Sequence, residues 1–309
     1  MRKKITVVGA GNVGATVAHC CLRKDLGDVT LIDIAENVAK GKALDLTQAS
    51  VLEGHSYKVN GTGDYKDTEG SDLVIVTAGM VRKPGMSRDD LLKTNIAIVK
   101  DVMKSAVAAS PNALFIVVSN PVDVLCRTAL EAGKLAPHRL IGLSGMLDGS
   151  RLRAFIAEKA GVPAGTVTGL TLGEHGDAMV PLPRLATIGG VPAPSILSAD
   201  ELEEVRVKTT HGGAGVVALL GYSAYYAPGI AVATMAEAMI KDSHAIVNCS
   251  AYCSGQYGAN DIYMCVPARL GAKGVEEVVE LDLDSTEKAA LENSIASIKK
   301  NLDNAASLG

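Results

Sequence analysis

The sequence predicts an α/β protein whose first half is a doubly wound parallel sheet and whose second half is a mixed α+β domain. Two observations predict the first half. Short apolar runs rich in β-branched residues alternate with segments of helical periodicity as far as Leu143, and a glycine-rich turn joins the first run to the first helix. From Ser144 onward this alternation stops. We therefore expect two domains, at 1–145 and 146–309, which a chain of 309 residues also favours.

The stretch from Lys4 to Asp33 predicts a dinucleotide-binding unit of the Rossmann type. A plain βαβ unit without a ligand is the alternative, and it explains the sequence pattern less well. An apolar strand, 5–8, runs into the glycine-rich turn, a helix follows, and a second strand, 29–32, ends on Asp33. Gly9 permits the tight turn, Gly11 lets the backbone approach a pyrophosphate, and Gly14 lets the helix pack closely against the strand. The helix N-terminus offers unpaired N–H groups to phosphates. The predicted cofactor-binding residues here are Gly9, Ala10, Gly11, Asn12, Val13, Gly14 and Asp33.

Asp33 indicates which dinucleotide the first domain binds. It lies about 20 residues beyond the glycines, where a carboxylate accepts hydrogen bonds from the ribose diol. The same carboxylate repels a 2′-phosphate, and Ile34, Ala35 and Glu36 supply no arginine to hold one. The sequence therefore predicts NAD as the cofactor and 1–145 as the NAD-binding domain.

The other elements follow from apolar runs and from helical spacing. In the first domain we expect strands at 57–60, 73–76, 114–118 and 139–143, and helices at 37–49 and 91–107. In the second we expect helices at 146–160, 199–210 and 222–240, and strands at 167–172, 245–249, 264–269 and 275–280. A last amphipathic helix follows, with Asp284 and Glu287 as its capping pair.

Composition excludes several classes of protein. The chain is 48% hydrophobic and 21% charged with a formal net charge of −4, so it offers no basic face to nucleic acid. No apolar run is long enough to span a bilayer, and glycines and Asn12 interrupt the run that could pass for a signal segment. The six cysteines have neither disulfide-framework nor four-ligand zinc spacing. This favours buried thiols in a reducing cytoplasm and no metal site.

Two segments follow expected parallel strands at their carboxyl ends, where ligands bind in open α/β sheets. The first, 80–90, is a basic loop in an acidic protein, and its cations are Arg82, Lys83 and Arg88. A solvated surface loop is the alternative, but arginines beside a cofactor are typical of a lid over an anionic substrate. The second segment contains Asn120, for which an ordinary helix-capping role is an equally weighted alternative.

His175 is the strongest candidate for proton transfer among the six histidines. It lies between Gly173 and Gly176, which leave it uncovered, and acidic residues flank it. Asp148 is at the start of the preceding expected helix and is placed to hold the imidazole, as a carboxylate orients a general acid/base. The other five histidines have ordinary structural explanations.

These motifs, taken together, resemble the lactate/malate dehydrogenase superfamily. The resemblance rests on Gly9-Ala10-Gly11-Asn12-Val13-Gly14, Asp33, Arg82-Lys83-Pro84-Gly85-Met86-Ser87-Arg88, Val118-Ser119-Asn120-Pro121, Leu147-Asp148-Gly149-Ser150-Arg151 and Gly173-Glu174-His175-Gly176-Asp177. It extends in order over essentially the whole chain, and it is strongest for the lactate-dehydrogenase-like malate dehydrogenases of bacteria. Gly149 departs from the family, which usually has Ser, Thr or Ala there. A glycine in a helix costs about 1 kcal/mol relative to Ala, which affects local stability rather than chemistry.

The resemblance implies an enzyme that transfers hydride between NAD and a 2-hydroxy acid, with the following roles. Arg151 grips the substrate's C1 carboxylate. His175 exchanges the proton of the C2 oxygen, Asp148 stabilises the imidazolium, and Arg88 closes with the lid to polarise the carbonyl. Further expected contacts are Asn120 to the same oxygen, Ser223 and Ala224 to the substrate, and Asn95, Val118, Ser119 and Asn120 to NAD.

Arg82 decides which 2-hydroxy acid we expect. The resemblance implies that this position faces the far end of the substrate, and lactate dehydrogenases carry Gln there. Arg82 instead offers a cation to a second carboxylate, which favours the dicarboxylates malate and oxaloacetate over lactate and pyruvate. NAD-dependent glycosidases share the glycine turn but need neither the lid arginines nor the histidine turn. A non-enzymatic NAD-binding or structural protein is the alternative of another class, which Arg88, Asp148, Arg151 and His175 disfavour.

The expected partners are a small dicarboxylate and further copies of the same chain. The long apolar helices indicate buried subunit contacts. The resemblance implies a dimer or a tetramer, of which we expect the homotetramer. We expect a cytoplasmic enzyme of the tricarboxylic acid cycle that binds neither nucleic acid nor membrane.

Overall fold

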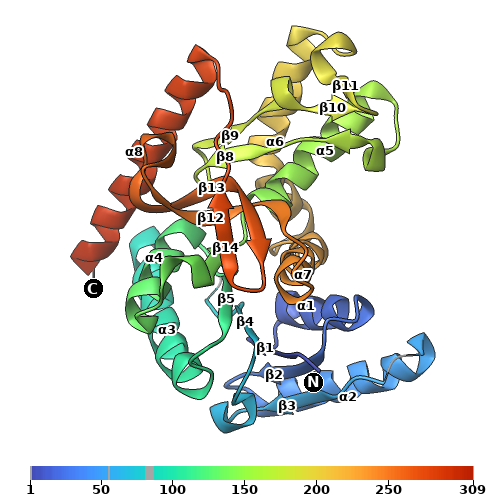
Figure 1. Ribbon diagram of the computed structural model, residues 1–309, viewed down its shortest axis with the longest axis vertical. Coiled ribbons are helices and arrows are strands. Elements are labelled where there is room, and N and C mark those ends of the chain that lie inside the picture. Colours follow the sequence, from blue (N-terminus) through green and yellow to red (C-terminus); the bar gives the residue numbers. More distant parts are fainter. Residues whose placement is uncertain (1, 55, 81–86, 309) are drawn as a thin grey trace.

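The computed structural model describes residues 2–54, 56–80 and 87–308. Of Arg88 it describes only the backbone. Within these residues an eleven-stranded sheet extends through both halves of the chain, in the order β3-β2-β1-β4-β5-β6-β12-β13-β8-β9, with β14 paired to β13. Figure 1 shows this arrangement, with the N-terminal half below and the C-terminal half above. None of the described helices combines the length and the apolar character needed to cross a membrane.

The N-terminal part of the sheet is a parallel, doubly wound unit, as the sequence predicts. Its strands are β1 (Lys4–Val8), β2 (Asp28–Ile32), β3 (Val59–Thr62), β4 (Leu73–Val76), β5 (Leu114–Val117) and β6 (Leu140–Gly142). Each neighbouring pair is parallel, and the order β3-β2-β1-β4-β5-β6 reverses between β1 and β4. In a sheet of this kind ligands bind at the carboxyl ends of the strands beside the reversal.

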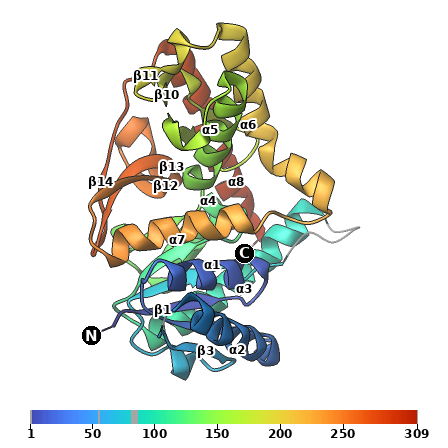
Figure 2. The ribbon, with the colours of Figure 1, turned by 90° about the vertical axis from the view of Figure 1, so that its right-hand side faces the viewer.

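Helices cover both faces of the parallel strands. On β4, Leu73 and Ile75 join the core that contains α1 (Asn12–Arg23) and α7 (Tyr226–Ile240), while the alternate residues Val74 and Val76 join the core beneath α3 (Arg88–Ala109) and α4 (Val122–Gly133). Because successive strand residues point to opposite faces, a continuous apolar run supplies both cores. Figure 2 shows α7 lying along α1, so a helix of the C-terminal half completes the N-terminal layer.

The C-terminal half is attached through an antiparallel hairpin. β12 (Ala245–Ser254) pairs with β13 (Asn260–Gly271) along its length, and Ser250 pairs with Gly142 of β6. The other elements here are α5 (Gly145–Ala160), α6 (Ala199–Leu220), α8 (Ser285–Leu308), β8 (Thr171–Gly173), β9 (Met179–Pro181), β14 (Gly274–Val278), and a small sheet of β7 (Val167–Thr168), β10 (Thr187–Ile188) and β11 (Val191–Pro192). The remaining elements are α2 (Glu36–Glu53) and the 3-10 helices Tyr65–Thr68, Pro137–Arg139, Ala164–Thr166, Pro183–Leu185, Ala193–Ser195 and Gln256–Gly258.

The structure differs from the sequence-based expectation mainly in the C-terminal half. The expected strand 167–172 is two strands, β7 and β8, which belong to different sheets. Helix α6 extends ten residues beyond Thr210, through three glycines that lower helix propensity. Gly212 and Gly213 lie against Arg151 of α5, and most residues of this extension are exposed. Asp284 and Glu287 do cap α8, since each side chain accepts the backbone N–H of the other.

Candidate active site

The glycine-rich turn between β1 and α1 has the close backbone packing that its sequence indicates. Gly9 has φ +101°, a conformation that side chains rarely allow. A Cβ on Gly14 would lie 1.8 Å from the Gly9 carbonyl oxygen, so only glycine lets α1 start this close to the turn. A Cβ on Gly11 would meet no protein atom within 4 Å, which leaves the space beyond it open to a ligand.

A cavity of about 630 Å³ lies at the carboxyl ends of the parallel strands, next to this turn. Gly9, Gly11 and Asp33, three of the predicted cofactor-binding residues, line it. Its wall also includes residues that sequence reasoning missed, among them Tyr65 of the 3-10 helix after β3, and Asp101 and Ser105 of α3. These three have no motif, and only the fold brings them to the glycine turn. The size, the open backbone at Gly11 and the carboxylate fit a bound dinucleotide.

Asp33 connects the second strand to the glycine turn. Its Oδ2 accepts the Ala10 N–H at 2.6 Å, and its Oδ1 accepts the Ala35 N–H at 2.8 Å. Asn12 and Val13 form the first turn of α1, with its N–H groups directed toward the turn. The structure therefore brings Asp33 into direct contact with the predicted cofactor segment 9–14 at the carboxyl ends of β1 and β2.

Asn95 and the segment 118–120 meet at the same edge. Asn95 is 2% exposed, its Oδ1 accepts the Met80 N–H at 2.7 Å, and its Nδ2 donates to the Asn120 carbonyl at 3.0 Å. Val118 and Ser119 follow β5, and Ser119 donates its hydroxyl to Ala78. Asn120 is exposed and does not cap a helix, because the N-cap of α4 is Pro121. Asn95 is thus buried at the strand ends, whereas Asn120 is exposed there.

His175, Asp148 and Arg151 form a half-buried charged cluster in the C-terminal half. His175 follows β8, and its Nδ1 lies 2.6 Å from Asp148 Oδ2. Arg151 Nη1 donates to the other oxygen, Asp148 Oδ1, at 2.9 Å. The side chain of Asp148 is 1% exposed, those of His175 and Arg151 14% and 19%. One buried carboxylate therefore holds both an imidazole and a guanidinium. Asp148 and Arg151 lie one helical turn apart on α5, and His175 reaches the carboxylate from the turn after β8.

The imidazole of His175 is biased toward its protonated form. Burial alone would lower its pKa, but the Asp148 carboxylate and its hydrogen bond, followed by the charge of Asp123, raise the pKa above its usual value. Arg151 acts in the opposite direction by a smaller amount. An imidazole that keeps a proton near neutral pH and can still release it is suited to acid/base catalysis.

Sequence reasoning missed the residues that hold the histidine turn. Asp123 Oδ2 accepts the His175 backbone N–H at 2.8 Å. From α8, Ser294 accepts the Glu174 N–H at 2.7 Å, and Asn301 donates to the Glu174 carboxylate at 2.7 Å. An acid inside the apolar run 122–126 was a detectable signal for Asp123, whereas nothing in the sequence connects α8 to residue 174.

Arg151 packs against the glycines of α6. A Cβ on Gly212 would lie 2.9 Å from Arg151 Cδ, and one on Gly213 would lie 3.5 Å from the guanidinium nitrogens. A Cβ on Gly149, the residue unusual for the family, would lie 3.2 Å from the Gly169 carbonyl oxygen. The glycines that weaken α6 as a helix therefore provide the space that the arginine occupies.

The remaining predicted site residues are not joined to this cluster by any described contact. Arg82 lies outside the described residues, and nothing is described of the Arg88 side chain. Arg88 begins α3, whose N-terminus is fixed by a capping box in which Ser87 Oγ accepts the Asp90 N–H at 3.0 Å. Ser223 and Ala224 lie in the connection between α6 and α7, where Ser223 is exposed.

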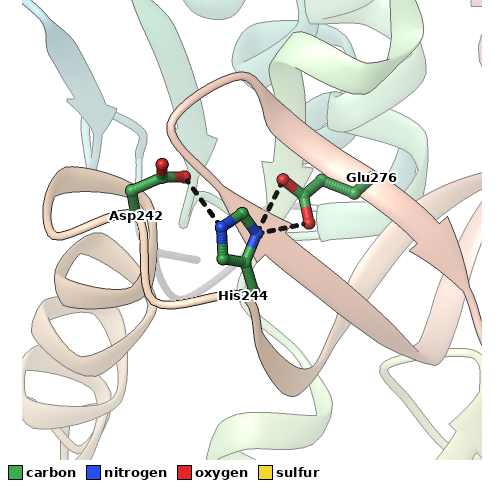
Figure 3. A group of neighbouring side chains, drawn as sticks. All are labelled: Asp242, His244 and Glu276. Atoms are coloured by element: carbon green, nitrogen blue, oxygen red, sulfur yellow. Dashed lines mark hydrogen bonds and ion pairs between the residues drawn. The ribbon is translucent and has the colours of Figure 1, made fainter.

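Another titratable group lies at the far end of α7 and is not part of this site. His244 Nδ1 is 2.8 Å from Glu276 Oε2, and His244 Nε2 is 3.8 Å from Asp242 Oδ1 (Figure 3). The hydrogen bond and charge of Glu276, with Asp242, raise the pKa of His244. All three residues are solvent-accessible, so this is a surface ion-pair group that joins α7 to the β13–β14 hairpin.

Comparison with known proteins places the whole chain in one family. The family model for the lactate/malate dehydrogenase NAD-binding domain matches residues 3–142, and that for the lactate/malate dehydrogenase alpha/beta C-terminal domain matches 145–308. The malate dehydrogenase of Salinibacter ruber is 48% identical over 301 residues, which cover 97% of this chain and 96% of that protein.

Solved structures agree with this match. A solved structure of the Salinibacter ruber malate dehydrogenase has a TM-score of 0.95 at 46% identity, and the match covers 99% of this chain and 98% of that one. The Eimeria maxima lactate dehydrogenase with NADH and oxamate also has a TM-score of 0.95, at 39% identity, and the match covers 100% of this chain and 95% of that one. The chain belongs to the lactate/malate dehydrogenase family.

Proposed function

We propose that this protein is an NAD-dependent malate dehydrogenase, which interconverts (S)-malate and oxaloacetate. The observation that carries the proposal is the His175–Asp148–Arg151 cluster, in which a proton donor and an anion-binding arginine share one buried carboxylate. This cluster is the equipment needed to bind a 2-keto acid and protonate its oxygen. An intact cluster of this kind also argues against a structural protein that has lost catalysis.

The cofactor half supplies the binding surface for NAD. The N-terminus of α1 and the backbone of 9–14 would hold the pyrophosphate, and Asp33 would bind the adenosine ribose. The nicotinamide end of NAD would contact Val118, Ser119 and Asn120. Asn95 would either contact NAD itself or hold in place the segments after β4 and β5 that contact it. The bound nicotinamide exchanges a hydride with C2 of the substrate.

The C-terminal half performs the proton transfer. The His175 imidazolium would donate the Nε2 proton to the keto oxygen during reduction, and the neutral imidazole would take it back from the hydroxyl during oxidation. Asp148 would stabilise the imidazolium through Nδ1. Arg151 would bind the C1 carboxylate, Arg88 and Asn120 would polarise the C2 carbonyl, and Ser223 and Ala224 would line the substrate site.

Arg82 is the proposed determinant of substrate choice. The fold does not separate malate from lactate dehydrogenases, because solved structures of both match it equally well. A guanidinium at residue 82 would pair with the second carboxylate of oxaloacetate. With pyruvate it would be left without a partner once the lid excludes water.

The test compares oxaloacetate and pyruvate as oxidants of NADH, before and after Arg82→Gln. Truncating one member of a buried charge pair costs about 2–5 kcal/mol, which is roughly a thirty- to several-thousand-fold change in kcat/KM. We expect kcat/KM for oxaloacetate to fall at least thirtyfold, roughly the lower end of this range, and kcat/KM for pyruvate to rise. An unchanged ratio would contradict the role of Arg82, and a wild-type preference for pyruvate or for NADPH would contradict the proposed function or cofactor.

The assembly and location are also part of the proposal. Large apolar side chains are exposed on α2 and around the α6–α7 connection: Val38, Leu44, Val51, Leu52, Leu219, Leu220, Tyr226 and Ile230. We propose that these exposed apolar side chains form subunit contacts of a homotetramer, with a dimer as the alternative. Sedimentation of the purified protein measures this directly. We propose that the enzyme acts in the cytoplasm, with its six cysteines, all described and all free, as thiols.

A further inference from the structure

A second buried carboxylate lies beside His175. Asp123 is in the first turn of α4 and is 5% exposed, in a segment whose neighbours Val122 and Val124 belong to the apolar core. Its Oδ2 accepts the His175 backbone N–H at 2.8 Å, and its Oδ1 accepts the Ser250 hydroxyl at 2.7 Å. Both oxygens therefore have neutral donors, and no lysine or arginine is among the described partners of this carboxylate.

Asp123 bridges the two halves of the protein at the point where they meet. It lies on α4 of the N-terminal half, three residues after Asn120, whereas His175 and Ser250 belong to the C-terminal half. Ser250 is also the residue of β12 that pairs with Gly142 of β6. The carboxylate thus connects the strand end that carries Asn120, the junction of the sheet and the backbone of the histidine.

The charge of Asp123 acts on His175 and is itself sensitive to its surroundings. Burial raises the pKa of Asp123 to about 6, against the hydrogen bonds from His175 and Ser250. Asp123 therefore loses its proton less readily than an ordinary aspartate, and once ionised its charge helps raise the pKa of His175. The groups facing these two residues are Asp148 and Arg151 from α5, Glu174 from the histidine turn, Ser250 from β12, and the thiols of Cys126 and Cys265.

We infer that Asp123 is a positioning residue for the reaction: its ionised carboxylate fixes the His175 backbone to the cofactor half and supplies a second negative charge that favours the imidazolium. Asp148 orients the ring at Nδ1, and Asp123 fixes the backbone from which that ring projects. The kinetic consequence rests on the proposed function, whereas the effect on His175 protonation does not.

The experiment is a proton NMR titration of the imidazoles in the full-length wild type and in Asp123→Asn, with the His175 signal assigned by its loss in His175→Asn. The Asn variant keeps a carbonyl to accept the His175 N–H and an amide to donate to Ser250, but it removes the charge. We expect the His175 midpoint to fall by about 1 pH unit, the lower end of the effect of a neighbouring opposite charge. An unchanged midpoint overturns the inference, because a purely structural role survives in the Asn variant.

Two further variants keep the test decisive. Ser250→Ala removes one hydrogen bond that stabilises the Asp123 charge, so it should shift the midpoint in the same direction by less, and it serves if Asp123→Asn does not fold. Thr128→Val is the matched control, since Thr128 is a buried polar residue of α4 bonded only locally, to the Val124 carbonyl. A shift in the control as large as that in Asp123→Asn would also overturn the inference.

The pH profile of malate oxidation provides the kinetic counterpart. Neutral His175 accepts the hydroxyl proton, so kcat/KM rises with pH through the His175 pKa, and the midpoint in Asp123→Asn should move to lower pH by the same amount as in the titration. If the wild type does not oxidise malate at all, the proposed function fails while the NMR result still decides the role of Asp123.

Discussion

Different kinds of chemical group form the cofactor cavity and the His175 cluster. Around the cavity, the glycine-turn backbone and mostly uncharged side chains provide the surface, Asp33 and Asp101 are its charged residues, and its main motif is contiguous in sequence from Gly9 to Gly14. In the cluster, charged side chains from α4, α5 and the β8 turn meet around two buried carboxylates. The cavity therefore depends on shape and the cluster on electrostatics, so the same kind of substitution should affect them differently.

The largest effect should come from His175→Asn, which removes the proton donor and leaves the cavity intact. We expect kcat to fall by about 10²–10⁴-fold in both directions, the usual contribution of a positioned acid/base, with NADH affinity nearly unchanged. In the wild type, kcat/KM should rise with pH for malate and fall with pH for oxaloacetate, because the two directions need opposite protonation states of His175. Parallel pH profiles, or full turnover in the variant, would remove His175 from the mechanism.

The next largest effect should come from Asp148→Asn, because this change weakens the contacts of residue 148 with both His175 and Arg151. We expect roughly a hundredfold loss of kcat/KM, equivalent to about 2.7 kcal/mol. Because the Asp148 charge raises the pKa of His175, its loss should also move the pH profile for malate oxidation to lower pH. Glu158→Gln, an exposed acid on the same helix, is the control and should change neither. If Asp148→Asn behaves like that control, the pairing has no catalytic role.

Gly11→Ala tests how far dinucleotide binding depends on the shape of the cavity. The added Cβ meets no protein atom within 4 Å, so the melting temperature should change little, while a bound pyrophosphate would be crowded. We expect NADH to bind roughly tenfold more weakly, about 1.4 kcal/mol, by fluorescence titration. The control is Gly41→Ala on α2, where the new Cβ also has nothing within 4 Å and the cavity is not involved. Equal NADH affinity in the two variants would argue against pyrophosphate binding at Gly11.

The smallest effect should come from Gly212→Ala, a shape change at the edge of the electrostatic cluster. Its Cβ would lie 2.9 Å from Arg151 Cδ, so the arginine must shift. We expect KM for oxaloacetate to rise about fivefold, near 1 kcal/mol, the lower end of the cost of overpacking. Gly215→Ala on the same helix, where a Cβ meets nothing within 4 Å, should leave KM unchanged. Identical KM values for the two variants would show that Arg151 does not depend on its glycine neighbours.

Much of this protein could be predicted from local sequence signals. The glycine turn, Asp33 and the parallel strands were recognisable because the residues that build them lie close together in sequence and follow strand or helix periodicity. The pairing of His175 with Asp148 was also predicted, and the structure places the two atoms 2.6 Å apart. The roles of the site residues, including Arg82 outside the described residues, stay predictions.

Other features were decided only by the tertiary structure. The two-part region 167–173 depends on pairing between strands far apart in sequence, and α6 continues to Leu220 through three glycines although local propensity disfavours it. The carboxylate of Asp123 and the α8 side chains at Glu174 reach the histidine turn across 52 to 127 residues of chain. A sequence can show that Asp123 is an acid among apolar residues. Only the folded chain determines which charge it faces, because burial and the neighbouring dipoles come from segments that carry no shared motif.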